Sequence, residues 1–182
     1  MSTKTPMAFL SYVRADDEHE GGRLSQFREM LSREVQMQAG EAFPIFQDRN
    51  DIKWGQNWQQ RIDDSLDSVT LLIPVITPGF FKSQACRDEL SRFLQREQVL
   101  GRSDLVLPLY YVDSRILNDA SKRAADALAQ AINAHQYADW RELRFETFTS
   151  PVVRRKVAEL ERALGRKTYE LEIAGKALAG WE

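Results

Sequence analysis

Four short apolar runs, rich in β-branched or aromatic residues, recur along the first 112 residues of the chain. They cover residues 7–12, 43–46, 69–76 and 105–112. The runs are continuous rather than alternating, which is typical of strands that are covered on both faces. They predict buried strands of a sheet with helices on both sides.

Between and after these runs, apolar side chains recur at helical spacing. Four helices are expected. The first carries Leu24, Phe27, Leu31 and Val35, and the second carries Trp58, Ile62 and Leu66. The third runs from about Gln84 to Leu100 and ends before Gly101, and the fourth is alanine-rich, begins near Asp119 and carries Leu128 and Ile132. Strands that alternate with helices indicate βαβ units and a parallel sheet with right-handed crossovers.

Two prolines break the strand pattern. Pro74 and Pro108 fall inside the third and fourth apolar runs, where a proline cannot donate a hydrogen bond to a ladder. We expect both prolines near strand ends or at bulges.

The last third of the chain predicts one more strand and one more helix. Residues 135–140 fit a short edge strand, which brings the expected sheet to five strands. Ser150 followed by Pro151 is a typical helix start, with a capping residue and a proline at the first helical position. Val153, Val157, Leu160 and Leu164 continue this helix to an expected stop at Gly165.

These patterns divide the chain into one α/β domain and a C-terminal extension. A length of 182 residues suits a single domain with one core. We expect the domain to span residues 1–145. Residues 146–182 then form a C-terminal helix and tail, packed on the domain or leading to a partner domain.

Charge and composition narrow the classes of partner. The net charge is −2, from 25 basic and 27 acidic residues, so no global field attracts nucleic acid or an anionic membrane. No apolar stretch approaches the roughly 20 residues that span a bilayer, and the first residues lack the apolar segment of a secretory signal. Cys86 is the only cysteine, which excludes internal disulfides and fits a reducing compartment. A cytoplasmic location is expected.

Several kinds of catalytic site are excluded by the motifs. The chain has neither Gly-x-Gly-x-x-Gly nor Gly-Lys-Ser/Thr, so neither Gly-rich phosphate loop is present. His19 and His135 belong to no metal-ligand spacing, and no metal site is expected. Asp16 and Asp17 follow the first strand, as in a phospho-receiver domain, but residues 77–79 read Thr-Pro-Gly where that class needs an acceptor aspartate.

One octet, residues 83–90, places a carboxylate where ligands bind in α/β proteins. It reads Ser-Gln-Ala-Cys-Arg-Asp-Glu-Leu and opens a helix directly after the third strand. The carboxyl edge of an open α/β sheet is the usual ligand site. Helical spacing sets Glu89 beside Cys86 and Phe93, at the border of an apolar stripe. The alternative is a solvated glutamate that pairs with Arg92.

Three segments in order resemble a TIR (Toll/interleukin-1 receptor) domain, particularly of the bacterial type. They are Ala8-Phe9-Leu10-Ser11-Tyr12 with Arg14; Phe46-Gln47-Asp48 followed by Ile52, Gly55 and Trp58; and Ser83, Cys86, Glu89 and Leu90 within the octet. The similarity covers roughly residues 7–140. One departure is Ala85, where the family pattern favours a tryptophan that shapes the nicotinamide pocket.

The resemblance implies a flavodoxin-like, doubly wound parallel five-stranded sheet, and an enzymatic role for Glu89. Many TIR domains cleave NAD⁺ between ribose and nicotinamide, giving ADP-ribose or a cyclic variant, and Glu89 matches their catalytic glutamate. NAD⁺ is then a substrate, and no cofactor is implied. The family also implies self-association through TIR–TIR contacts, a fused or separate sensor or effector protein, and a role in bacterial immune signalling.

The same resemblance places the substrate-binding residues in three loops. They are Ser11, Tyr12, Arg14, Asp48, Lys53, Trp54, Ser83 and Cys86. Arg14, Arg49 and Lys53 are candidates to neutralise the diphosphate, with ordinary surface charge as the alternative. Three of these residues also have a structural alternative. Asp48 could fix the conformation of its own loop, and Trp54 could pack against its neighbours. Cys86 could be a small buried apolar side chain.

Two other functions remain open at this point. A TIR domain without turnover would act as an interaction module or scaffold, and Ala85 in place of tryptophan favours it. An enzyme similar to nucleoside deoxyribosyltransferases would also use one glutamate at an N-glycosidic bond, and would ignore NAD⁺.

Overall fold

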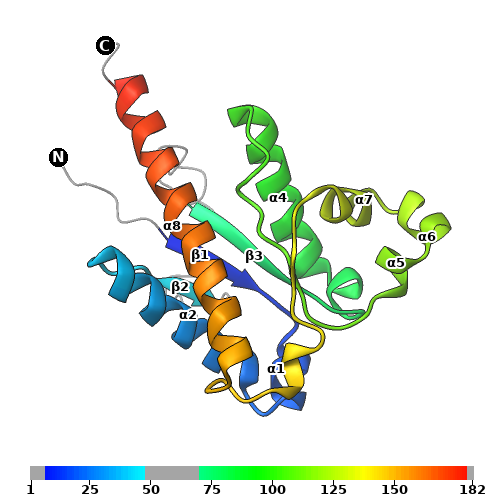
Figure 1. Cartoon of the computed structure of the whole chain (residues 1–182). Coiled ribbons are helices and arrows are strands. Elements are labelled where there is room, and N and C mark those ends of the chain that lie inside the picture. Colours follow the sequence, from blue (N-terminus) through cyan, green and yellow to red (C-terminus); the bar gives the residue numbers. More distant parts are fainter. Residues whose placement is uncertain (1–6, 48–69, 180–182) are drawn as a thin grey trace.

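The structure, a computed structural model, describes residues 7–47 and 70–179 (Figure 1). The helix expected around Trp58, Ile62 and Leu66 lies outside the described residues. So do the candidate residues Asp48, Arg49, Lys53 and Trp54.

Five parallel strands form the centre of the molecule, as the hydrophobic pattern predicted. They are β1 (Met7–Ser11), β2 (Ile45–Gln47), β3 (Thr70–Ile76), β4 (Leu109–Tyr110) and β5 (Ala138–Asp139). Their order is β2-β1-β3-β4-β5, so the chain reverses direction across the sheet beside β1. Ligands in such sheets bind at the carboxyl edge near this reversal, which lies between β1 and β3.

The two prolines each remove one donor from the sheet. Pro74 lies inside β3, not near its end as expected. Leu72 donates its N–H to Leu105 O at 2.8 Å, so the alternate residue Pro74 has its missing donor on the β4 side. Pro108 directly precedes β4, and its carbonyl accepts from Ala138 N at 2.9 Å. The strand expected over residues 105–112 is therefore short, with a single bridge between Leu72 and Val106 ahead of it.

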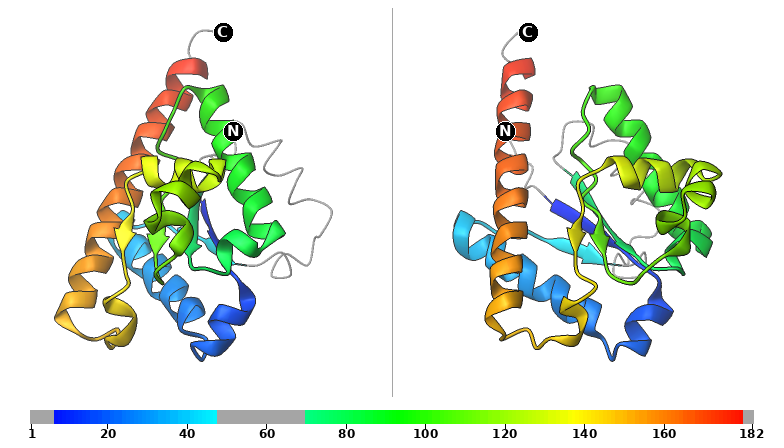
Figure 2. Two further views of the ribbon diagram at one scale, coloured as in Figure 1. Left: turned by 90° about the vertical axis from the view of Figure 1, so that its right-hand side faces the viewer. Right: turned by 45° about the vertical axis from the view of Figure 1, so that its right-hand side comes forward.

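Helices cover both faces of the sheet (Figures 1 and 2). The helices α2 (Arg23–Ala39) and α8 (Pro151–Ala179) pack side by side on one face. On the other face, α4 (Gln84–Leu100) packs on β3 and carries α7 (Ala127–Ala134). The remaining short helices are α1 (Arg14–His19), η1 (Phe80–Lys82), α5 (Arg115–Asn118), α6 (Ala120–Ala124) and η2 (Leu143–Phe145).

The ends of α4 match the sequence prediction because both signals are local. The Ser83 hydroxyl accepts from Cys86 N at 3.3 Å, and this satisfies one of the donors left open at the helix start. Gly101 takes a left-handed conformation with φ 62° and ends the helix.

The prediction of one continuous alanine-rich helix from Asp119 is wrong. It is divided into α6 and α7 at Asp126, whose carboxylate accepts from Leu128 N at 3.0 Å and Ala129 N at 3.2 Å. An aspartate that binds these two amides caps a new helix and interrupts the preceding one.

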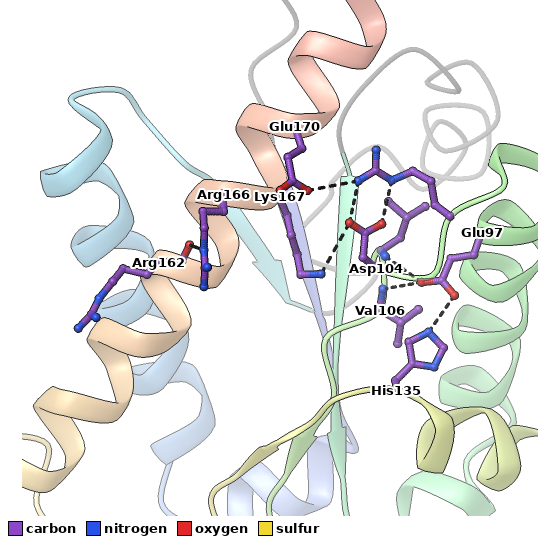
Figure 3. A network of polar contacts seen from close by, with 10 residues as sticks. Glu97, Asp104, Val106, His135, Arg162, Arg166, Lys167 and Glu170 are labelled. Atoms are coloured by element: carbon purple, nitrogen blue, oxygen red, sulfur yellow. Dashed lines mark hydrogen bonds and ion pairs between the residues drawn. The ribbon is translucent and has the colours of Figure 1, made fainter.

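The expected stop at Gly165 is also wrong, because α8 continues to Ala179. Just past the glycine, Lys167 Nζ lies 3.8 Å from Asp104 Oδ2, and Glu170 Oε2 lies 3.9 Å from Arg102 Nη2 (Figure 3). These contacts attach the second half of α8 to the connection between α4 and β4. They offset the roughly 1 kcal/mol that a glycine costs inside a helix. No described helix is long and apolar enough to cross a membrane.

A second network fixes the far end of α4. Glu97 Oε1 accepts from Leu105 N at 2.8 Å and Val106 N at 3.1 Å, and Glu97 Oε2 lies 2.9 Å from His135 Nε2 (Figure 3). The other ring nitrogen of His135 lies 2.7 Å from Ala131 O. Ala131 O can only accept, so Nδ1 carries a hydrogen, and the Glu97 carboxylate favours a second hydrogen on Nε2. The hydrogen bond to Glu97 accordingly raises the pKa of His135.

Candidate functional site

The Glu89 side chain lies at the carboxyl edge of the sheet, where the octet predicted it. It is on the second turn of α4, and α4 follows β3 through the short segment 77–83. Glu89 is 8% exposed. The alternative of a solvated glutamate is therefore wrong.

One hydrogen-bond partner of Glu89 comes from the neighbouring strand β1. Ser11 is the last residue of β1, is 1% exposed, and donates its hydroxyl to Glu89 Oε2 at 2.6 Å. A short hydrogen bond to an ionised acceptor holds that oxygen in one direction. The two residues are 78 positions apart in the chain, and the parallel sheet brings them together at the reversal between β1 and β3.

Cys86 belongs to the same buried group but is no nucleophile. It is buried one turn before Glu89, and desolvation raises the pKa of its thiol against opposing hydrogen bonds from Ser83 and Ser11. A thiol with a raised pKa carries little of the reactive thiolate at neutral pH. Cys86 therefore contributes shape to the site rather than chemistry.

The other candidate residues that the structure describes have distinct places. Tyr12 is half-buried, directly after Ser11, and Arg14 is exposed at the first position of α1. Ser83 caps α4 with its side chain, so its local role is structural.

A contact that the sequence did not reveal ties the two loops of this edge together. Asp16 Oδ2 accepts from Thr77 Oγ1 at 2.6 Å, and Thr77 Oγ1 accepts from Phe80 N at 3.2 Å. Gly79 packs closely against the residues after β1. A Cβ atom at this glycine would lie 3.5 Å from Val13 Cγ2 and 3.6 Å from Asp16 Oδ2. The connection after β1 and the connection after β3 are thus held against each other around Ser11 and Glu89.

The neighbouring Asp17 has a purely structural role. Its carboxylate accepts from Leu24 N at 2.8 Å and from Ser25 Oγ at 2.6 Å, at the start of α2. The pair Asp16–Asp17 therefore serves two different contacts and forms no shared acidic pocket. Sequence reasoning missed these roles because α1, with six residues, is too short to show a hydrophobic period.

The site offers one type of chemistry among the residues that the structure describes. In the described ranges 7–47 and 70–179, no group of three or more His, Cys, Asp and Glu side chains could hold a metal ion. What remains at this edge is a carboxylate, mostly withdrawn from solvent and oriented by a hydroxyl. Such a group stabilises a positive charge that develops on a bound ligand, since electrostatic interactions strengthen where water is excluded.

Comparison with known families agrees with this geometry. A family model described as the TIR domain matches residues 9–151, which include most of β1, all of β2 to β5 and the Ser11–Glu89 pair. No curated protein matches the chain.

Proposed function

The chain belongs to the TIR domain family, and from this premise we propose that it cleaves NAD⁺ at the bond between ribose and nicotinamide. The observation that supports the proposal is the buried Glu89 carboxylate, oriented by the Ser11 hydroxyl at the carboxyl edge of the sheet. The products are nicotinamide and ADP-ribose, linear or cyclic.

The reaction suits a site with a single carboxylate. Glycosidases generally use two, because one must protonate a poor leaving group. Nicotinamide leaves from a pyridinium as a neutral molecule and needs no proton. The ribose left behind resembles an oxocarbenium ion, which the Glu89 carboxylate stabilises by charge and by hydrogen bonds to ribose hydroxyls. Glu89 is the catalytic residue in this proposal, and Ser11 is its positioning residue.

The substrate and the assembly follow from the same edge of the sheet. Arg14, exposed at the start of α1, is the candidate in this proposal to attract the diphosphate of NAD⁺. Turnover depends on association of several copies through TIR–TIR contacts. If these contacts are head-to-tail they are heterologous and extend into filaments. Clustering by a sensor protein would then switch on the reaction, in the manner of a bacterial immune signal.

A test uses the purified chain at high concentration, free and clustered on beads. NAD⁺ loss and nicotinamide release are followed by chromatography, and mass spectrometry identifies the ribose product. Glu89→Gln is expected to lower turnover by about 100-fold or more, the range for removing one electrostatic contact to a transition state.

A matched control is available on the neighbouring residue. Asp88 is exposed and bonded to Gln84 at 2.8 Å, so Asp88→Asn removes one carboxylate from the same turn and leaves turnover unchanged. Unchanged turnover in Glu89→Gln would contradict the role of Glu89.

A scaffold without turnover is the second candidate, and Ala85 supports it. Ala85 is half-buried directly before Cys86, where the family pattern has a tryptophan, so the site lacks that ring for stacking on nicotinamide. A scaffold would associate and recruit partners, yet release no nicotinamide even when clustered.

A further inference from the structure

A cleft that the proposed reaction does not use lies beside the carboxyl ends of β3 and β4. Its volume is about 400 Å³, and its walls come from the segment after β3, the segment between β4 and α5, and α6. Figure 1 shows α5 and α6 on the same side of the molecule as the start of α4. Neither Ser11 nor Glu89 lines this cleft.

Three cationic side chains lie around the cleft. Lys82, Arg115 and Lys122 are in its lining and are exposed. Within the described residues, none of these three side chains forms an ion pair or a hydrogen bond. Asp113 is also in the lining, but its carboxylate accepts from Arg141 Nη1 at 2.6 Å and from Asn118 Nδ2 at 3.2 Å. Arg141 pairs with this acid and with Asp139. The lining thus holds three cationic side chains and one carboxylate, which is already paired.

A buried hydroxyl in the same lining lacks a partner. Ser114 is 1% exposed, and its Oγ atom has no hydrogen-bond partner among the described residues. Ser114 precedes α5, but its side chain does not cap that helix. Buried polar groups are nearly always satisfied, and an exception points to a missing ligand, ion or water. Because Ser114 is in the lining, this unsatisfied group lies beside the cleft.

The wall that holds Ser114 is fixed before any ligand arrives. Ser114 N donates to Tyr110 Oη at 3.1 Å, and Tyr110 Oη donates to Asn118 Oδ1 at 2.7 Å. The guanidinium of Arg141 lies 4.4 Å from the centre of the Tyr110 ring. A preformed wall lowers the ordering cost of binding.

The size and the apolar part of the lining define the ligand further. Pro78 and Ile116 supply apolar walls, and the volume lies within the usual range for small-molecule sites. A bare phosphate would fill only a fraction of this space. We propose that the cleft binds a phosphate monoester with an apolar or ring-containing body, of the size of a nucleoside monophosphate, at a site separate from Glu89.

Adenosine monophosphate is a suitable probe, with adenosine and inorganic phosphate as its two parts. Binding to the full chain is measured by calorimetry at low salt, and located by shifts of backbone amide signals in NMR spectra. We expect AMP to bind more tightly than either part, with the largest shifts at Ser114, Arg115 and Ile116. Affinity should fall as salt is added, since exposed charges are screened.

Variants separate this site from its surroundings. Arg115→Ala combined with Lys122→Ala is expected to weaken AMP binding about 10-fold or more, the effect of losing charge-assisted contacts. Arg155 is exposed on α8, away from the cleft, and Arg155→Ala is the matched control with unchanged affinity. Both cleft positions are exposed, so the fold is retained.

Glu89→Gln distinguishes this inference from the proposed reaction. The cleft site predicts that AMP binding persists in Glu89→Gln, whether or not the chain cleaves NAD⁺. The inference is overturned if AMP does not bind at millimolar concentration. It is equally overturned if the double variant binds as the parent does, or if Glu89→Gln abolishes binding.

Discussion

Two buried glutamates on the same helix, Glu89 and Glu97, have different partners. They are eight residues apart on α4, about two turns, and are 8% and 5% exposed. Glu97 accepts from two backbone amides and a histidine, at 2.8, 3.1 and 2.9 Å. Glu89 accepts from a side-chain hydroxyl at the edge where ligands bind. Burial alone therefore does not distinguish the two carboxylates, whereas the hydrogen bonds described and their places along α4 do.

The largest expected effect concerns Glu97 and the fold. Glu97→Ala leaves Leu105 N and Val106 N without their acceptor and His135 without its counter-charge. Removing one member of a buried pair costs about 3–5 kcal/mol, so the free energy of unfolding measured in urea should fall by that amount. Glu97→Gln keeps an acceptor for the two amides, so its free energy of unfolding should fall clearly less than that of Glu97→Ala. A loss below about 1 kcal/mol in Glu97→Ala would contradict the structural role.

A smaller effect is expected at Ser11, and on turnover rather than stability. Ser11→Ala removes the hydroxyl that orients Glu89, and kcat for NAD⁺ should fall about 10-fold with KM little changed, because an oriented charge acts mainly in the transition state. In a Glu89→Gln background, the same substitution should have no further effect. An additive loss in the double variant would mean that Ser11 acts independently of Glu89.

The Glu97–His135 pair also predicts how stability depends on pH. The pKa of His135 is raised in the folded state, so the folded protein binds the proton more tightly than the unfolded chain does. The stabilisation is complete below about pH 6.5, the ordinary histidine value, and is lost as pH rises through the folded pKa. We therefore expect the free energy of unfolding to decrease as pH rises through the folded pKa of His135, and urea titrations at a series of pH values measure this decrease.

Two histidine variants isolate the source of that dependence. His135→Gln should remove it, while His19→Gln, on an exposed residue of α1, should leave it in place. A slope that survives in His135→Gln would assign the effect to another group.

The smallest expected effect is that of Glu89→Gln on stability. Glu89→Gln keeps the shape of the side chain and an acceptor for the Ser11 hydroxyl, and should change the free energy of unfolding by less than about 1 kcal/mol. Urea titrations of Glu89→Gln and Glu97→Gln compare the same substitution on the same helix. Equal losses in the two variants would remove the distinction between them.

The parts of the fold that were predictable from sequence are those with local signals. Continuous apolar runs predicted the strands, and Ser83 and Gly101 predicted both ends of α4. The meeting of Ser11 and Glu89 was also predictable in outline, because both follow strands whose carboxyl ends share an edge. These inferences need only the sequence near each residue and the rules of a parallel sheet.

The parts that were missed depend on contacts between distant residues. Glu97 and His135 are 38 positions apart, and no local pattern announces their pairing. Gly165 is a helix stop by local rules, and α8 passes through it where Lys167 lies beside Asp104. The cleft lining joins residues 78 and 82 to residues 113–116 and 122, and no local pattern predicts that its three cations lie together.

Pro74 has a consequence for how the sheet opens. Without its N–H, the ladder from β3 to β4 is made at Leu72 and again at Val75 and Ile76, with one rung missing between them. A missing hydrogen bond weakens the ladder locally, and local opening takes place where backbone hydrogen bonds are fewest. The amides of Leu107 and Tyr111, which donate to Leu72 O and Ile76 O on the two sides of the gap, should then exchange with deuterium at separate rates.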